Sequence, residues 1–168
     1  MSPILLYYTG QGTDTRGRTL DDTQRLDHNR MEYIHDFIQW MFPLPTPSAH
    51  NPSAPILNDD DVIAFHQQPQ LQHNLQTSFI AFLHFLGLAY QEGQVVEIGA
   101  STRRDHLFKI PNHNWLRITR VLLSLKTLGL DNESRAFFAY LQIVHQREPA
   151  ITPATFSYWH DAAKGIAH

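Results

Sequence analysis

The segment HDFIQWMFP, residues 35–43, gathers side chains that could do chemistry. His35 next to Asp36 gives an acid/base or hydrogen-bonding pair whose charge can change near neutral pH. If the segment is helical, 100° per residue places His35, Asp36 and Gln39 on one polar side within a turn, with Trp40 at its boundary. The opposite side is apolar and is expected to face the core.

A second segment, NHNWLRITR at residues 112–120, carries two arginines on a helical pattern. The same projection puts His113, Arg117 and Arg120 on one stripe, with Asn114 beside His113 in the chain. Apolar residues lie on more than one side of this helix, which indicates a central position. Buried arginines are costly unless they are paired, so they need carboxylate partners or an anionic ligand.

These two segments support a first hypothesis, a ligand- or protein-binding module with a polar groove between two helices. Arg117 and Arg120 would hold an acidic group, or the carboxylates that shape the groove, and Trp40 would form an apolar wall. A small anionic ligand, a peptide or a protein is the expected partner. The candidate ligand-binding residues are His35, Asp36, Gln39, Trp40, His113, Asn114, Arg117 and Arg120. The structural alternative is a solvated polar face and an ion-pair network with Glu32 or Asp36.

An enzyme is the second hypothesis. His35 would act as general base, Asp36 would orient it, and the arginines would stabilise developing negative charge. The third hypothesis is a metal or haem site built from some of the eleven histidines. No HExxH or His-x-x-x-His pair occurs, His84 is expected to be buried in the core, and no cofactor is predicted.

Residues 12–19, GTDTRGRT, have the spacing of a phosphate-binding Walker A loop, with Arg18 in place of the lysine. That chemistry needs the lysine and a parallel sheet behind the loop, and the chain shows no alternating strands and helices. The alternative is a turn-rich segment held in place by Arg16 or Arg18, and it is the reading that we favour.

The composition narrows the possible classes of protein. The 168 residues, with 42% hydrophobic and 17% charged residues, are typical of one globular domain, which we place at 1–168 with its core at about 17–163. Since cysteine is absent, disulfides and thiolate chemistry are excluded. A net charge of −3 argues against a nucleic-acid binder. No signal peptide or membrane-spanning run is found, so we expect a cytoplasmic protein without membrane contact.

The pattern of apolar residues, caps and prolines predicts an all-α fold of five to seven helices with at most one or two very short strands. Thr19, Asp27 and Asn58 are predicted N-caps, and Pro43 should end the helix that Asp27 opens. The other predicted elements are a short strand or extended arm at 4–8, an irregular proline-rich segment at 43–55, helices at 69–86, 112–128, 131–146 and 153–164, and a loop with one or two short strands at 93–110.

These motifs resemble the conserved domain of the opioid growth factor receptor family. Its members carry a His-Asp-aromatic-Ile-Gln-Trp-hydrophobic-Phe-Pro segment, which His35 to Pro43 match, and an Asn-x-Leu-Arg-Ile-Thr-Arg segment, which Asn114 to Arg120 match. The run LLSLKTLGL also fits the family pattern. The resemblance covers about residues 17–163 and is closer to short, single-domain bacterial members than to the animal receptors. It implies a helical fold and the importance of both motifs.

Some animal members of this family have a long C-terminal repeat region and are described as binding an enkephalin peptide and regulating growth. That receptor role does not transfer to the conserved domain taken alone, and the resemblance supplies no reaction. Whether the chain is a binding module or an enzyme therefore stays open at this point.

Overall fold

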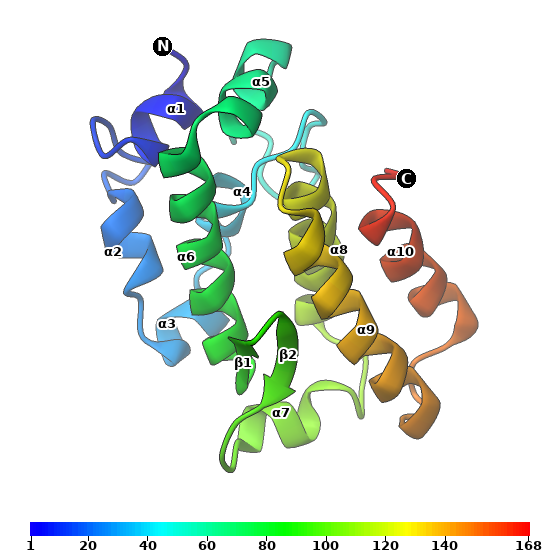
Figure 1. Ribbon diagram of the computed structural model, residues 1–168. Coiled ribbons are helices and arrows are strands. Elements are labelled where there is room, and N and C mark those ends of the chain that lie inside the picture. The colour runs from blue at the N-terminus through cyan, green and yellow to red at the C-terminus, as the bar shows by residue number, and fades with distance from the viewer. The chain divides into compact units, whose positions relative to one another are not determined.

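The computed structural model describes all residues from 1 to 168 and is mostly helical, as predicted. It contains ten helices and one two-stranded antiparallel sheet (Figure 1). Five of the helices have only four to six residues, which is why the count exceeds the five to seven that we expected. The chain forms two compact units, Met1–Ala81 and Phe82–His168, and each is described by itself.

Unit 1 is built from short helices and the first part of one long helix. In chain order these are α1 (Pro3–Tyr8), α2 (Leu20–Gln24), α3 (His28–Tyr33), α4 (Ile38–Met41), α5 (Asp59–Gln67) and α6 (Pro69–Phe85), whose last four residues belong to unit 2.

The helix starts in unit 1 follow the predicted capping residues. The side chains of Thr19, Asp27 and Asn58 each accept a hydrogen bond from a backbone N–H in the first turn of α2, α3 and α5. At Thr19 and Asn58 the cap is reciprocal, because Asp22 and Asp61 accept from the backbone of the capping residue. These caps satisfy N–H groups that have no partner within the helix.

Residues 4–8 form helix α1, so the predicted strand or extended arm is wrong. Pro3 occupies the first turn, where its missing N–H is not needed, and Ser2 caps it. Ile4, Tyr7 and Tyr8 are completely buried on one side of this helix. The helix is therefore favoured over a strand, because helical spacing places these three residues on the same buried side. In a strand, side chains alternate between two faces, and the three residues would not all face the core.

The core of unit 1 contains polar contacts from buried tyrosines. The Tyr8 hydroxyl donates to the backbone oxygen of Met41 and also bonds Ser78 Oγ on α6, at 3.0 Å. Gln24 on α2 donates to the same Ser78 Oγ at 3.0 Å, which joins α2 to the neighbouring α6 (Figure 1). The Tyr8 ring also packs edge-on against Phe65 of α5 at 5.1 Å. α1, α2, α5 and α6 thus share one core.

Unit 2 has a hairpin followed by four helices. Its elements are β1 (Leu88–Gln91), β2 (Gln94–Glu97), α7 (Thr102–Leu107), α8 (His113–Thr127), α9 (Asp131–Arg147) and α10 (Pro153–Ala163). The last three helices agree with the predicted ones to within a residue or two.

Helix α8 packs against both α9 and α10 (Figure 1). Trp159 of α10 is completely buried, and its Nε1 donates to the backbone oxygen of Trp115 on α8 at 3.2 Å. Its ring lies edge-on to those of Trp115 and Phe108, each at 6.1 Å. On α9, Ser134 Oγ donates to the Leu122 oxygen at 3.1 Å. α8 is therefore central within unit 2, as the sequence indicated.

The region expected to be a loop with short strands contains the hairpin β1–β2 and, in addition, helix α7. Ser101 caps α7, so the part of the expected loop at residues 102–107 is in fact helical. Arg104 of α7 donates to three backbone oxygens, those of Gly87, Ile98 and Gly99, at 2.7 to 2.8 Å. These bonds attach α7 to the base of the hairpin. Local helix propensity does not predict this attachment, because the acceptors lie outside α7.

We predict that Gly87→Ala destabilises the protein by about 2–5 kcal/mol, measured by urea unfolding. Gly87 has φ of +78°, which costs an L-residue about 1–2 kcal/mol. An added Cβ would also lie 2.6 Å from Ser101 Oγ, and such overpacking costs about 1–3 kcal/mol. Gly93→Ala is the matched control, because φ is +75° with no atom within 4 Å, so only the conformational cost remains. Equal losses in both variants would refute the predicted clash.

Candidate functional site

The HDFIQWMFP segment is not one continuous helix, and this corrects the sequence-based projection. α3 ends at Tyr33, Ile34 is extended with φ −90° and ψ 126°, and α4 begins only at Ile38. His35 and Asp36 lie in the bend between the two helices. Helical spacing therefore does not relate His35 and Asp36 to Gln39.

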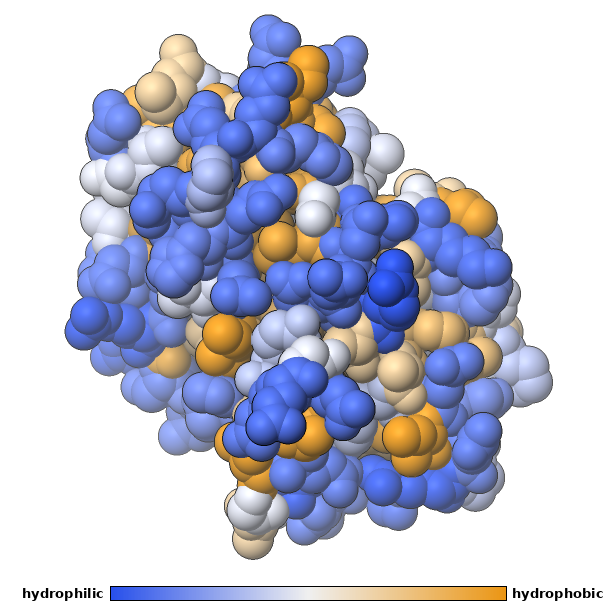
Figure 2. Space-filling view, in the orientation of Figure 1, coloured by the Kyte–Doolittle hydropathy of each residue, from blue (hydrophilic) through white to orange (hydrophobic).

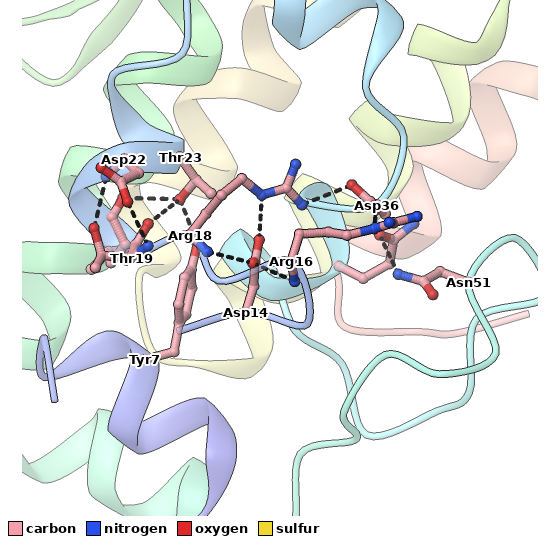
Figure 3. Close-up of polar contacts among 11 residues, drawn as sticks. Tyr7, Asp14, Arg16, Arg18, Thr19, Asp22, Thr23, Asp36 and Asn51 are labelled. Carbon is pink, nitrogen blue, oxygen red and sulfur yellow. Dashed lines mark hydrogen bonds and ion pairs between the residues drawn. The ribbon is translucent and has the colours of Figure 1, made fainter. Parts of the chain in front are cut away.

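A network of two arginines and two aspartates fixes this bend (Figure 3). Arg18 Nη2 donates to Asp36 Oδ1 at 2.7 Å, and its Nε donates to Asp14 Oδ2 at 2.7 Å. Arg16 Nε donates to the other oxygen of Asp36 at 3.0 Å. Arg18 thus bridges the loop at 10–19 and the bend, and the ion pairs take up both oxygens of Asp36. A helix through residues 34–37 would move Asp36 away from this position.

Asp14 is the buried centre of the loop, with a side chain that has no exposed surface. Its Oδ1 accepts the backbone N–H groups of Arg16 and Arg18, both at 2.9 Å. In a phosphate-binding loop such N–H groups surround the ligand. In this chain they surround the carboxylate of Asp14, so the favoured interpretation, a turn-rich segment held by Arg18, agrees with the geometry.

The electrostatics of the network favour its charged form. Partial burial opposes ionisation of Asp36, but hydrogen bonds from Arg18 and Arg16 outweigh it, and the pKa of Asp36 lies below its usual value. Burial likewise works against the charge of Arg18, yet its bonds to Asp36 and Asp14 raise its pKa above the usual value. Both Asp36 and Arg18 are therefore ionised at neutral pH.

The remaining candidates in unit 1 are placed differently from the predicted polar face. His35 is exposed, whereas Gln39 is only 4% exposed and its Oε1 accepts from Asn51 Nδ2 at 3.3 Å. Trp40 is 5% exposed and packs edge-on against Tyr7 at 5.3 Å. The enzyme hypothesis requires His35 in a concave pocket, and an exposed position in a bend gives it no support.

The second motif forms the first half of α8, as predicted. Asn112 caps the helix, and His113 is half-buried at its first position. Asn114 and Arg117 are buried, and Arg117 Nη1 donates to Asn114 Oδ1 at 3.4 Å. Burial lowers the pKa of Arg120 to about 10, which still leaves it protonated at neutral pH.

The candidate residues thus fall into two sets. His35, Asp36, Gln39 and Trp40 belong to unit 1, and His113, Asn114, Arg117 and Arg120 belong to unit 2. In unit 2 a hydrogen bond joins Arg117 to Asn114, whereas in unit 1 Asp36, Gln39 and Trp40 contact different partners. The groove between the two motifs stays a prediction. Sequence reasoning expected Arg16 or Arg18 to hold this loop but missed the role of Asp14, although this aspartate, two residues before Arg16 and four before Arg18, was visible in GTDTRGRT.

The histidines give no metal cluster. No group of three or more histidine, aspartate or glutamate side chains in the structure could hold a metal ion. His84 is exposed on α6, so its expected burial is wrong. No helix is both long and apolar enough to cross a membrane.

Comparison with known proteins identifies relatives. The family model described as "Opioid growth factor receptor (OGFr) conserved region" matches residues 11–166. The opioid growth factor receptor of mouse is 29% identical over 139 residues, which cover 79% of this chain and 22% of that protein. The human receptor is 28% identical over 144 residues, with coverages of 82% and 21%.

The opioid growth factor receptor-like protein 1 of mouse is 27% identical over 138 residues, covering 79% of this chain and 30% of that protein. The chain therefore spans about a fifth to a third of the length of these relatives. No solved structure matches the chain. The expected kinship with short bacterial members stays a prediction.

We predict that Asp36→Asn lowers the free energy of unfolding by about 1 kcal/mol at pH 7, because Arg16 and Arg18 lose their shared anion. Since folding lowers the pKa of Asp36, its contribution is present above about pH 4 and is lost as the pH falls below that. Urea unfolding from pH 7 to pH 3 should show the two proteins converging. Asp21→Asn, which breaks an exposed pair with Arg25, is the control and should change stability by less than about 0.5 kcal/mol. A difference between the two proteins that does not shrink from pH 7 to pH 3 would contradict the prediction.

Proposed function

The chain belongs to the opioid growth factor receptor conserved-region family, and we propose that it is a binding module that holds a carboxylate of a peptide partner on helix α8. The observation that carries the proposal is the pair of largely buried arginines, Arg117 and Arg120, on one side of that helix. The family's named receptors supply the expected class of ligand, opioid growth factor.

The chemistry of α8 favours an acidic group. The helix contains no aspartate or glutamate, so any anion that faces its arginines comes from outside the helix. Arg117 is 5% exposed, and burial lowers the pKa of Arg120 without discharging it. Buried guanidinium groups are stable only beside carboxylates or other acceptors, and the planar fork of arginine binds a carboxylate through two hydrogen bonds.

Unit 2 places these arginines on a rigid support. α8 is held on α9 through Ser134 and on α10 through Trp159, so its arginines lie on a packed helix. A binding residue on a helix is held more precisely than one on a loop.

The surface supports a purely apolar docking site less well than it supports recognition of a charged group by α8. On the face shown in Figure 2, hydrophilic residues predominate and hydrophobic residues form separate small patches. Exposed large side chains such as Ile63, Ile110 and Ile143 lie on different elements of the chain. Charge recognition by α8 therefore accounts for partner binding better than a broad hydrophobic interface does.

We predict that opioid growth factor with a free C-terminal carboxylate binds the protein in calorimetric titrations, and that its C-terminal amide binds at least tenfold more weakly. Arg120→Gln should weaken binding of the free acid by about 10- to 100-fold, because a charge-assisted hydrogen bond contributes about 1.5–3 kcal/mol. Arg120→Lys keeps the charge but loses the planar fork, and should fall between Gln and the native protein.

Arg135→Gln is the matched control. Arg135 is exposed on α9, with Asn132 at 3.5 Å as its hydrogen-bond partner, so binding should not change. Circular dichroism establishes that each variant is folded. If folded Arg120→Gln binds like the native protein, or if the amide binds as tightly as the acid, the proposed role of α8 is wrong.

A further inference from the structure

The proline-rich segment of unit 1 forms a closed loop between α4 and α5 (Figure 1). Its ends meet at two nearly buried residues, since the Leu57 N–H donates to the Leu44 oxygen at 3.0 Å. Residues 45–56 between these ends contain no helix or strand. Because the ends lie within hydrogen-bond distance, a much shorter connection would join the two helices. A surface loop with this geometry is an Ω-loop, and such loops often carry function.

Asn51 orders the interior of this loop. Its Nδ2 donates to Oε1 of the nearly buried Gln39 on α4, at 3.3 Å. Its Oδ1 accepts from Ser53 Oγ at 3.0 Å, and its backbone oxygen accepts from the Ala54 N–H at 3.0 Å. Its own N–H donates to Ser48 Oγ at 3.2 Å. These bonds hold the loop in a defined shape, so binding it costs a partner little conformational entropy.

The loop presents proline rings to solvent and carries no formal charge. Pro45, Pro47 and Pro52 are exposed. Residues 45–56 contain no aspartate, glutamate, lysine or arginine. A partner therefore gains little from ion pairs at this loop and has to recognise the rings themselves. Rigid proline-rich segments are bound by grooves that are lined with aromatic side chains.

We propose that the loop at 45–56 is a docking site for a protein domain with an aromatic-lined groove, which contacts Pro45, Pro47 and Pro52. The site lies in unit 1 and is independent of the carboxylate site proposed on α8 of unit 2. Each proposal can fail without the other, because neither requires one partner to contact both units.

The test titrates the 15N-labelled protein with three isolated probes, a WW domain, an SH3 domain and an EVH1 domain, and follows the amide resonances by NMR. At least one probe should bind, with the largest shifts at the non-proline residues of 45–56. If none of the three binds at about 1 mM, the docking site is refuted. Loop resonances that shift with the protein's own concentration before any probe is added would also overturn it, because a second copy of the chain would then occupy the loop.

A triple variant tests the proline rings. Pro45→Ala, Pro47→Ala and Pro52→Ala together should weaken binding of that probe about tenfold or more, because the apolar ring area is lost. Pro149→Ala is the matched control, since Pro149 is an exposed proline outside the loop and its replacement should leave binding unchanged. If the triple variant is folded by circular dichroism and binds like the native protein, the rings are not what the partner recognises.

Asn51→Ala tests the ordering of the loop. It keeps all three exposed prolines but loses the side-chain bonds to Gln39 and Ser53. The amide order parameters across 45–56 should fall, and the probe should bind about two- to tenfold more weakly, because the loop then has to be ordered on binding. Lower order parameters with unchanged affinity would overturn the claim that a preordered loop is recognised.

Discussion

The buried carboxylate of Asp14 is the constraint on which the polar architecture of unit 1 depends. A carboxylate without solvent contact must be matched by donors, and the loop supplies two backbone N–H groups and the Arg18 guanidinium. Arg18 then reaches Asp36, and Asp36 recruits Arg16. This chain of pairings determines where the HDFIQWMFP segment bends, and so which of its side chains lie in the core and which are exposed.

In unit 2 the buried charged groups are cations, and they need hydrogen-bond acceptors just as the buried Asp14 needs donors. α8 is surrounded by packing partners, yet it carries the buried Arg117 and also Arg120, whose pKa of about 10 leaves it charged at neutral pH despite burial. Aromatic packing of Trp115 and Trp159 holds the helix in place, while Arg104 and the Tyr140–Glu97–Arg147 contacts secure the hairpin. The unit therefore combines an apolar core with buried guanidinium groups, which are stable only beside hydrogen-bond acceptors.

Local signals in the sequence predicted much of the helical fold. Thr19, Asp27 and Asn58 begin helices because each offers a side-chain oxygen to unpaired backbone N–H groups. The spacing of apolar residues located α6, α8, α9 and α10 nearly to the residue. The same signals failed at Ile4–Tyr8, where a short apolar run fits a strand or a helix equally well, and at Ser101–His106, where the decisive bonds of Arg104 come from the hairpin.

The sequence by itself determined the all-α fold class, because periodicity and helix caps are local properties of the chain. Its motifs likewise indicated the family and the importance of the HDFIQWMFP and NHNWLRITR segments. Only the tertiary structure decided how the first segment is used. The pattern of HDFIQWMFP is compatible with one amphipathic helix, but ion pairs with Arg16 and Arg18, about twenty residues earlier in the chain, favour a bend at Asp36. That bend exposes His35 and buries Gln39, and no helical projection of the segment alone contains this information.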